Sequence, residues 1–472
     1  MFLPDVLGQW ASRAALLLVV AVGCGSQSED AGSADGGAPG AGGDNTTGGV
    51  PPGTGGATAS GGAAPGGGGG TTSGGASSGG AGIGGTATGG AATGGAAAGG
   101  AGTGGGNSGG ASSGGAGAGG AGDGPEPFVF GSPPRAAVHF KRGINLGNRL
   151  EAPSEGDWGG SILASDFPFI AARGFDHVRI PIRFSGHALP NPPYTIDETF
   201  LVRVDTVIDQ ALSANLAVII DLHAYEELAA DVSAERARFV AIWAQLAERY
   251  RQLPETVAFE LLNEPYDDLD AQWNQLLAEA IAAVRITNPR RLLVADTVFW
   301  ADPSRLNALV LPDDANIMTS IHLYEPKLFS FQGQTWMSAE YQTTGVVFPG
   351  PPATPIVPVQ AAQTAAWASQ WFNDYNTLPA ATNPAGPATI DAQIALIEGY
   401  RSSQGRTVYN GEWGPQDGGD LESRARLIRL VRERCEGAGI GWAIWEDPVN
   451  MSLFDSAAGT WNAPLVDALL PP

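Results

Sequence analysis

The 472-residue chain has little cysteine, few basic residues and no long apolar run. Its two cysteines, Cys24 and Cys435, exclude a disulfide-rich scaffold. The 25 Lys and Arg residues face 48 Asp and Glu, which gives a formal net charge of −23. An acidic surface of this kind argues against nucleic acid and anionic membrane surfaces as partners, and it tolerates a neutral ligand.

Two patterns that indicate other chemistries are also missing. The five histidines include no His-x-His pair, which disfavours a metal-dependent hydrolase. No glycine-rich phosphate loop follows the first strand-like run, which disfavours a doubly wound nucleotide-binding sheet.

The first 24 residues have the features of an export signal. Residues 14–22 form a nine-residue apolar run after Arg13, too short to span a bilayer but typical of a signal-peptide core. The run leads into Ala21-Val22-Gly23-Cys24, which resembles a bacterial lipobox and implies lipid attachment at Cys24. We therefore predict an extracytoplasmic protein, either a cell-surface lipoprotein or a secreted one, with any membrane contact made through the lipid.

Residues 25–127 consist mostly of Gly, Ala, Ser and Thr, and contain most of the chain's 69 glycines. This segment has no apolar periodicity and little to bury, so we predict a disordered linker. A flexible chain of this length has an r.m.s. span of roughly 55 Å. The remaining residues, 128–472, suffice for one large domain.

In this remaining part, apolar runs alternate with amphipathic helical stretches. The strand-like runs are 138–147, 177–184, 216–222, 257–263, 291–296, 315–323, 407–412 and 440–446. Thr195 and Glu198 have the spacing of a capping box, and apolar periodicity predicts a helix over 269–286. Eight βα units rich in Val, Ile and Leu predict a (β/α)₈ TIM barrel, with a doubly wound sheet as the alternative. A long insertion, 327–388, follows the sixth strand, and Phe331 and Trp336 near its start suggest a wall of a substrate cleft.

Two glutamates stand at strand ends in distinctive surroundings. Glu264 lies in Leu262-Asn263-Glu264-Pro265, and Glu412 lies in Asn410-Gly411-Glu412-Trp413-Gly414. Cleavage of a glycosidic bond needs one carboxyl that protonates the leaving oxygen and a second that attacks or guides water. The acid needs a raised pKa, whereas the nucleophile needs hydrogen bonds or a cation that keep it ionised.

Polar and aromatic residues occupy the other strand ends. They are Asn145, Arg179, His223, Asn263, His322, Tyr324 and Trp445. The C-terminal ends of barrel strands meet on one face, so we expect these residues to surround the two glutamates. A charged Arg179 between Val178 and Ile180 is costly to bury alone and requires a carboxylate partner.

These motifs resemble glycoside hydrolase family 5, the large cellulase family of retaining (β/α)₈ hydrolases. The resemblance covers 137–470 and rests on seven motifs in order: Arg142-Gly143-Ile144-Asn145-Leu146-Gly147-Asn148, Val178-Arg179-Ile180-Pro181, Asp221-Leu222-His223, Asn263-Glu264-Pro265, His322-Leu323-Tyr324-Glu325-Pro326, Gly411-Glu412-Trp413-Gly414 and Trp442-x-x-Trp445. The segments ending at Trp158 and Trp336 look like those of endoglucanase-like members, and Arg149 departs from the family pattern at the edge of the cleft.

The resemblance implies that Glu264 is the general acid/base and that Glu412 is the nucleophile. It implies no metal and no organic cofactor. The implied substrate-binding residues are Arg179, His223, Asn263, His322, Tyr324 and Trp445, to which we add Asn145, Trp158 and Trp336 as candidates.

We therefore predict a monomeric retaining endo-β-1,4-glucanase that acts on a polysaccharide, with a β-glucan as the expected substrate. One alternative is another β-glycanase of the same fold, such as a mannanase, xyloglucanase or β-1,3-glucanase. An alternative of a different class is a non-catalytic carbohydrate-binding lipoprotein, against which the presence of both Glu264 and Glu412 argues.

Overall fold

The computed structural model describes residues 124–471, and the signal segment, Cys24 and almost all of the predicted linker lie outside them. Within this part, eight parallel strands close into a barrel in the order β1 to β8. They are β1 (Arg142–Asn145), β2 (His177–Ile182), β3 (Ala217–Leu222), β4 (Val257–Glu260), β5 (Leu293–Asp296), β6 (Ile317–Leu323), β7 (Val408–Trp413) and β8 (Gly441–Ile444). Pairing of Ile144 with Ile444 closes the barrel. The predicted (β/α)₈ fold is confirmed.

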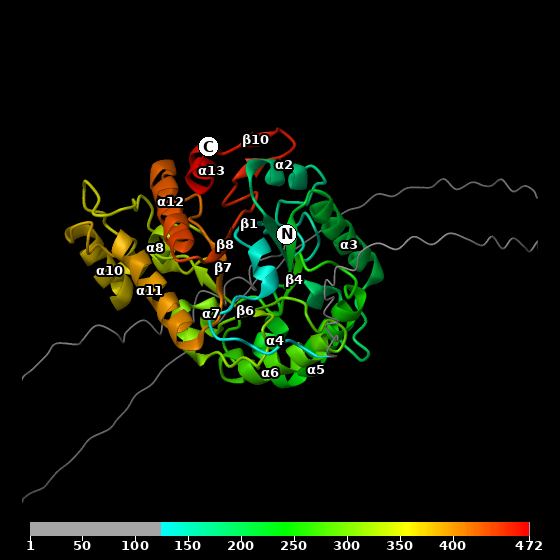
Figure 1. Ribbon diagram of the computed structural model, residues 1–472. Helices are drawn as coiled ribbons and strands as arrows, with labels where there is room; N and C mark the ends of the chain where they lie inside the picture. Colours follow the sequence, from blue (N-terminus) through cyan, green and yellow to red (C-terminus); the bar gives the residue numbers. More distant parts are fainter. Residues whose placement is uncertain (1–123, 472) are drawn as a thin grey trace, which may run out of the picture. The chain divides into compact units, whose positions relative to one another are not determined.

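Helices connect successive strands and surround the barrel, as Figure 1 shows. They are α2 (Asp166–Arg173), α3 (Glu198–Ser213), α4 (Glu226–Ala230), α5 (Val232–Arg249), α6 (Leu269–Arg285), α7 (Val298–Ala301), α8 (Lys327–Ser330), α9 (Gln360–Thr364), α10 (Ala366–Thr377), α11 (Pro387–Gln404), α12 (Leu421–Gly437) and α13 (Ala463–Leu469). Four 3₁₀ helices, η2 (Arg135–His139), η3 (Phe184–His187), η4 (Pro303–Ala308) and η5 (Ala339–Gln342), and a small hairpin, β9 (Phe454–Asp455) with β10 (Thr460–Trp461), complete the described residues.

The core has two parts because alternate residues of each strand face opposite sides of the barrel wall. The larger part packs strands against helices. The smaller part fills the lumen near the N-terminal strand ends and includes Ile219, Ala258, Val294 and Met318. Two residues further along each of these strands, the same alternation places polar side chains in the lumen: Asp221, Glu260, Asp296 and Ser320. The barrel interior therefore changes from apolar to polar toward the strand ends.

Two local predictions were wrong. The first strand begins only at Arg142, because the chain before it forms η2 and leaves Val138 exposed at the surface. The N-cap of α3 is Asp197, whose carboxylate accepts the Phe200 N–H at 2.8 Å, so the predicted capping box of Thr195 and Glu198 does not form. Asp197 has the shorter route to the free N–H groups of the first turn.

The insertion 327–388 is folded and contains α8, η5, α9 and α10. The Gln332 amide bonds both backbone groups of Val346, and the Tyr375 hydroxyl accepts the Val347 N–H at 2.8 Å. Its first part does stand beside the cleft, because the Phe331 ring lies 4.9 Å from that of Tyr324.

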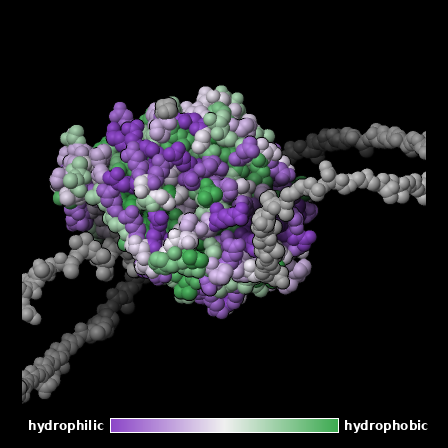
Figure 2. All heavy atoms as spheres, viewed as in Figure 1, coloured by the Kyte–Doolittle hydropathy of each residue, from purple (hydrophilic) through white to green (hydrophobic). Residues whose placement is uncertain are grey.

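The surface of the described domain is mixed in character. Figure 2 shows one face, on which hydrophilic side chains separate small hydrophobic patches. Among residues 124–471, no helix combines the length and the hydropathy that crossing a bilayer requires.

Candidate active site

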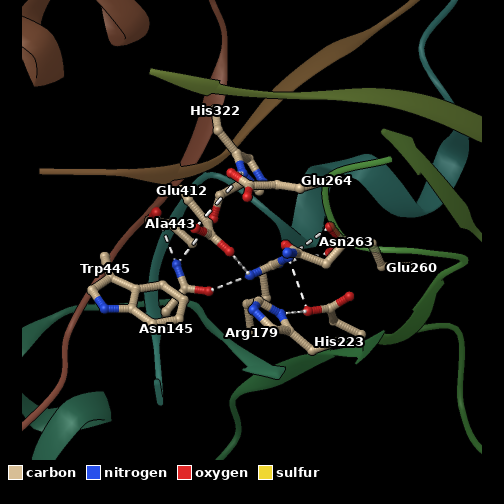
Figure 3. Close-up of polar contacts among 12 residues, drawn as sticks. Asn145, Arg179, His223, Glu260, Asn263, Glu264, His322, Glu412, Ala443 and Trp445 are labelled. Carbon is tan, nitrogen blue, oxygen red and sulfur yellow. Dashed lines mark hydrogen bonds and ion pairs between the residues drawn. The ribbon is translucent and has the colours of Figure 1, made fainter. Parts of the chain in front are cut away.

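The C-terminal strand ends bring the predicted residues together at one face of the barrel. Arg179 comes from β2, His322 from β6 and Glu412 from β7. The loops that follow β3, β4, β6 and β8 supply His223, Asn263 with Glu264, Tyr324 and Trp445. Figure 3 shows Glu264 and Glu412 next to His322, with Arg179 below them.

The two glutamates lie close together. A carboxylate oxygen of Glu264 and one of Glu412 are within 4.8 Å of each other. Between them, Nδ1 of His322 lies 2.7 Å from Oε1 of Glu264 and 3.6 Å from Oε2 of Glu412. A single bond of a substrate that lies between the two side chains would be within reach of both carboxyls.

Glu412 is held by two donors. Arg179 Nη1 donates to its Oε1 at 2.8 Å, and the Tyr324 hydroxyl donates to its Oε2 at 3.0 Å. The preceding Gly411 lets β7 approach β6, because a Cβ there would lie 2.7 Å from Ser320 Oγ and 3.1 Å from His322 Nε2. Hydrogen bonds to both oxygens favour the ionised form of a carboxylate.

Arg179 contacts several polar side chains at the base of the site. It forms a bidentate pair with Glu260, at 2.7 and 2.8 Å, and it contacts Asp221 at 3.0 Å. The Asn263 and Asn145 amide oxygens accept its remaining N–H groups at 2.8 and 2.9 Å. Although burial opposes its charge, these carboxylates hold the pKa of Arg179 well above its ordinary value. Arg179 thus has several carboxylate partners, where the sequence predicted at least one.

Glu264 has a strained backbone and a perturbed carboxyl. Its φ of 46° lies in the left-handed region, which costs a non-glycine residue about 1–2 kcal/mol. Its N–H donates to Asp296 Oδ2 at 2.9 Å, which helps to hold that conformation. Burial raises the pKa of Glu264, against the pull of nearby positive groups such as Arg179 and Lys327. A carboxyl with a raised pKa can carry a proton to a leaving group.

His322 acts as a neutral connector between these groups. Burial lowers the pKa of His322 to about 4, despite the neighbouring Glu412 carboxylate. A neutral imidazole has one N–H, and an Nδ1–H donated to Glu264 satisfies the shorter of its two contacts.

Aromatic rings form the outer parts of the site. The Trp445 ring lies 6.0 Å from that of His223, and its Nε1 donates to Asp447 at 3.1 Å. Gly147 is required beneath it, because a Cβ there would lie 2.3 Å from the indole. Half-buried Trp336 packs edge-on against Phe331 at 5.4 Å, in continuity with Tyr324.

Two of the predicted substrate-binding residues, Asn145 and Arg179, are buried more deeply than expected. Asn145 is fully buried, and its amide nitrogen donates to the carbonyls of Gly411, Ala443 and Ile444. Arg179 is also fully buried. Both therefore lie beneath the cleft and support Glu412, because every polar atom of these side chains faces protein. Trp158 is half-buried and makes no ring contact or hydrogen bond within residues 124–471.

Sequence reasoning missed a set of buried acids under the site. Asp221 accepts from His223 Nδ1 at 2.6 Å and forms an ion pair with Arg179 at 3.0 Å. Glu260 and Asp296 lie in the lumen layer below Glu264. The two-residue period of a strand could have identified them. Glu260 lies two residues after the lumen-facing Ala258, and Asp296 lies two residues after Val294, so both side chains face the lumen.

Within residues 124–471, two groups of three side chains are close enough to bind a common cation. One consists of Glu260, Asp296 and His322, and the other of Glu264, His322 and Glu412. Arg179 already bonds both oxygens of Glu260, and Arg179 with Tyr324 bonds both oxygens of Glu412. The contacts favour a hydrogen-bonded network over a metal centre.

Comparison with known proteins agrees with this geometry. The family model described as cellulase (glycosyl hydrolase family 5) matches residues 142–448, well over half of the chain. The chain belongs to glycosyl hydrolase family 5. Endoglucanase H of Acetivibrio thermocellus is 28% identical over 339 residues, which cover 70% of this chain and 33% of that protein. Endoglucanase C of the same organism is 31% identical over 226 residues, 45% of this chain and 66% of that protein. The chain thus spans about a third of the length of endoglucanase H.

Solved structures of the family share the barrel. Endoglucanase Cel5A from Thermotoga maritima is 35% identical and has a TM-score of 0.62, over 72% of this chain and 100% of that one. The same enzyme has been solved in complex with cellobiose and with mannotriose.

Proposed function

We propose that this member of family 5 is a retaining endo-β-1,4-glucanase. The observation that carries the proposal is the separation of at most 4.8 Å between carboxylate oxygens of Glu264 and Glu412. Retaining glycosidases keep their two carboxyls about 5–5.5 Å apart, whereas inverting enzymes need about 6.5–9.5 Å to admit a water molecule.

In this mechanism Glu264 protonates the leaving oxygen while Glu412 attacks the anomeric carbon. A glycosyl-enzyme ester forms on Glu412, the glycosidic bond breaks, and the proton of Glu264 leaves with the aglycone. Glu264 then removes a proton from water, which hydrolyses the ester. The raised pKa of Glu264 and the two donors on Glu412 support these roles.

Further side chains hold the sugar in this proposal. The Asn263 oxygen is committed to Arg179, and its amide nitrogen makes no hydrogen bond within the described part of the chain, so it can meet a sugar hydroxyl. The Trp445 indole offers a flat apolar face suited to a pyranose ring, and His223 stands beside it.

Azide rescue tests the two roles separately. With dinitrophenyl cellobioside, Glu412→Ala lowers turnover to near background, and azide restores it as the α-glycosyl azide. Glu264→Ala, which retains a working nucleophile, yields the β-glycosyl azide instead. Glu227→Ala, a variant of an exposed glutamate, gives neither product. An α-configured hydrolysis product from the native enzyme, observed by NMR, contradicts the retaining mechanism.

The choice of β-1,4-glucan is supported by the endoglucanases among the relatives. The mannotriose complex of the Thermotoga enzyme favours β-mannan as the second candidate. Xyloglucan and β-1,3-glucan are further alternatives. Product lengths from carboxymethylcellulose, barley β-glucan, glucomannan, xyloglucan and laminarin distinguish them, and early release of mixed oligomers from a polymer demonstrates endo action. Binding without hydrolysis of any of them would identify a non-catalytic carbohydrate-binding protein.

We also propose that the enzyme acts outside the cytoplasm as a monomer tethered through lipid on Cys24. The apolar run 14–22 and the lipobox-like Ala21-Val22-Gly23-Cys24 support this. Metabolic labelling with a radioactive fatty acid is expected to mark the native chain but not Cys24→Ser. Labelling of neither chain leaves secretion as the better explanation.

A further inference from the structure

Asp296 lies under the site and takes no part in the mechanism above. It ends β5, is completely buried, and accepts the Glu264 N–H through Oδ2 at 2.9 Å. Its Oδ1 is buried, and no N–H or O–H group within residues 124–471 donates a hydrogen bond to it. A carboxylate oxygen of Asp296 and one of Glu260 also lie within 4.8 Å of each other.

Two fully buried carboxyls this close are costly to keep ionised together. A proton on one of them removes that cost and supplies the donor that an ionised carboxylate lacks. Glu260 is the ionised member of the pair, since both of its oxygens accept from Arg179 in a bidentate pair at 2.7 and 2.8 Å. Asp296 has no comparable cation: the nearest nitrogen of a histidine, Nε2 of His322, is 3.7 Å away, and His322 is neutral. The proton therefore belongs on Asp296.

We propose that Asp296 is a neutral carboxylic acid throughout the working pH range of the enzyme, and that it acts as a positioning residue for Glu264. Its Oδ1–H donates to Glu260, while Oδ2 accepts the Glu264 N–H. One side chain thus connects the ionised pair of Arg179 and Glu260 to the strained peptide of the acid/base. This inference rests on the proposed function for its catalytic consequence, although the protonation state can be measured without turnover.

The neutral state also sets the charge around Glu412. The titratable groups that face Asp296 from the surrounding elements are Arg179, Asp221, Glu260, Glu264, His322 and Tyr409. Among them only Arg179 is a permanent cation. A further negative charge at Asp296 would compete for it with Glu412. Burial and the nearby Glu260 raise the pKa of Asp296 well above its ordinary value, in agreement with the geometry.

Three variants test the role in catalysis. Asp296→Ala removes both hydrogen bonds and is expected to lower kcat/KM by about 10- to 100-fold. Asp296→Asn keeps a donor for Glu260 and an acceptor for the Glu264 N–H, so it is expected to restore kcat/KM to within about threefold of the native value, with the same acid limb of the pH profile. Glu260→Gln makes the same carboxyl-to-amide change on the ionised partner and is expected to lose ~100-fold or more.

If Asp296 were ionised, Asp296→Asn would change the pH profile. Replacing it with Asn would then remove a negative charge, lower the pKa values of the neighbouring carboxyls and move the acid limb of kcat/KM down by about one pH unit. A shift of that kind, or an Asp296→Asn variant as impaired as Asp296→Ala, overturns the proposal.

Infrared spectroscopy provides a readout that is independent of activity and of the Ala variant's folding. The difference spectrum of the native chain minus Asp296→Asn at neutral pH is expected to contain the C=O stretch of one protonated carboxylic acid. Absence of this band overturns the proposal even when the enzyme is active, whereas a band in an inactive enzyme would contradict only the proposed function. Metal analysis of both chains completes the test: one equivalent of a cation that is lost in Asp296→Asn would show that a metal, rather than a proton, neutralises the cluster.

Discussion

Nη1 of Arg179 lies 2.8 Å from Oε1 of Glu412, and both side chains are buried. The same guanidinium also bonds Glu260 through two other nitrogens. The charge of Arg179 is thus shared between the proposed nucleophile and a carboxylate that never meets substrate. The position of Glu412 therefore depends on a group deep in the barrel lumen.

The first prediction concerns this pair. Arg179→Lys places a point charge where a planar fork serves five acceptors, so most of the hydrogen bonds are lost. We expect a loss of about 3–5 kcal/mol in the free energy of unfolding, together with a large fall in kcat. Arg249→Lys, at a partly exposed ion pair with Glu198 and Asp205, is the control and should cost less than about 1 kcal/mol. Urea denaturation and steady-state kinetics measure both, and equal effects in the two variants would contradict the special role of Arg179.

The second prediction concerns the pH dependence of activity. Since burial raises the pKa of Glu264, its carboxyl stays protonated to higher pH than an ordinary glutamate. Activity is expected to fall as the pH rises through that value, so Glu264 defines the basic limb of kcat/KM. Glu264→Gln should abolish that limb and slow hydrolysis of cellotetraose by ~10²- to 10⁴-fold. A dinitrophenyl leaving group needs no protonation, so its release should be affected much less. A basic limb that persists in Glu264→Gln would assign it to another group.

The third prediction concerns the cleft wall. Trp336 is half-buried and joined to Tyr324 through Phe331. If it stacks on a sugar, Trp336→Ala should raise KM for cellotetraose by about 3- to 10-fold and leave kcat little changed. Trp371 is a matched control in the same insertion, because its ring packs on Phe372 and Tyr375 of its own helix. The interpretation is wrong if Trp371→Ala raises KM equally.

The fourth prediction concerns a buried pair at the rim of the site. Arg149 Nη2 lies 2.8 Å from Oε2 of Glu446, and burial raises the pKa of Glu446 to about 7 despite that partner. In the unfolded chain this carboxyl ionises near its ordinary value of 4.5. The stability that it contributes is complete below that value and is lost as the pH rises through about 7.

Native protein should therefore lose about 3 kcal/mol more between pH 4.5 and 7.5 than Glu446→Gln does. Chemical denaturation of the two chains at both pH values gives the difference. A difference near zero would mean that Arg149 fully compensates for the burial of Glu446.

Much of the fold follows from local pattern. A run such as 216–222 is too apolar for a one-sided strand, and amphipathic helices between the runs leave a parallel barrel as the consistent solution. Pattern failed where two local options compete. Residues 138–141 look like strand but belong to η2 and the turn after it, and Asp197 caps α3 in place of Thr195. Both errors concern element ends, where a few residues decide between similar energies.

The composition of the site was predictable, but its depth was not. Glu264 and Glu412 stand out because strand-end carboxylates beside Asn263 and Trp413 are poor packing residues. Asn145 and Arg179 stand at strand ends as well, yet they lie beneath the cleft with every polar atom bonded to protein. A strand-end position specifies the end of the barrel at which a residue lies. Its depth below the cleft depends on the stagger of neighbouring strands.

Sequence alone thus determined the family, the barrel and the identity of the two carboxylates, since each depends on periodicity and on residue types within short motifs. Only the tertiary structure decided that Glu264 and Glu412 meet within 4.8 Å, and that one guanidinium serves Asp221, Glu260 and Glu412 together. It also decided that Asp296 lies under Glu264. The physical reason is that pKa values, proton positions and reaction geometry depend on distances between strands far apart in the chain. Those distances exist only once the barrel has closed.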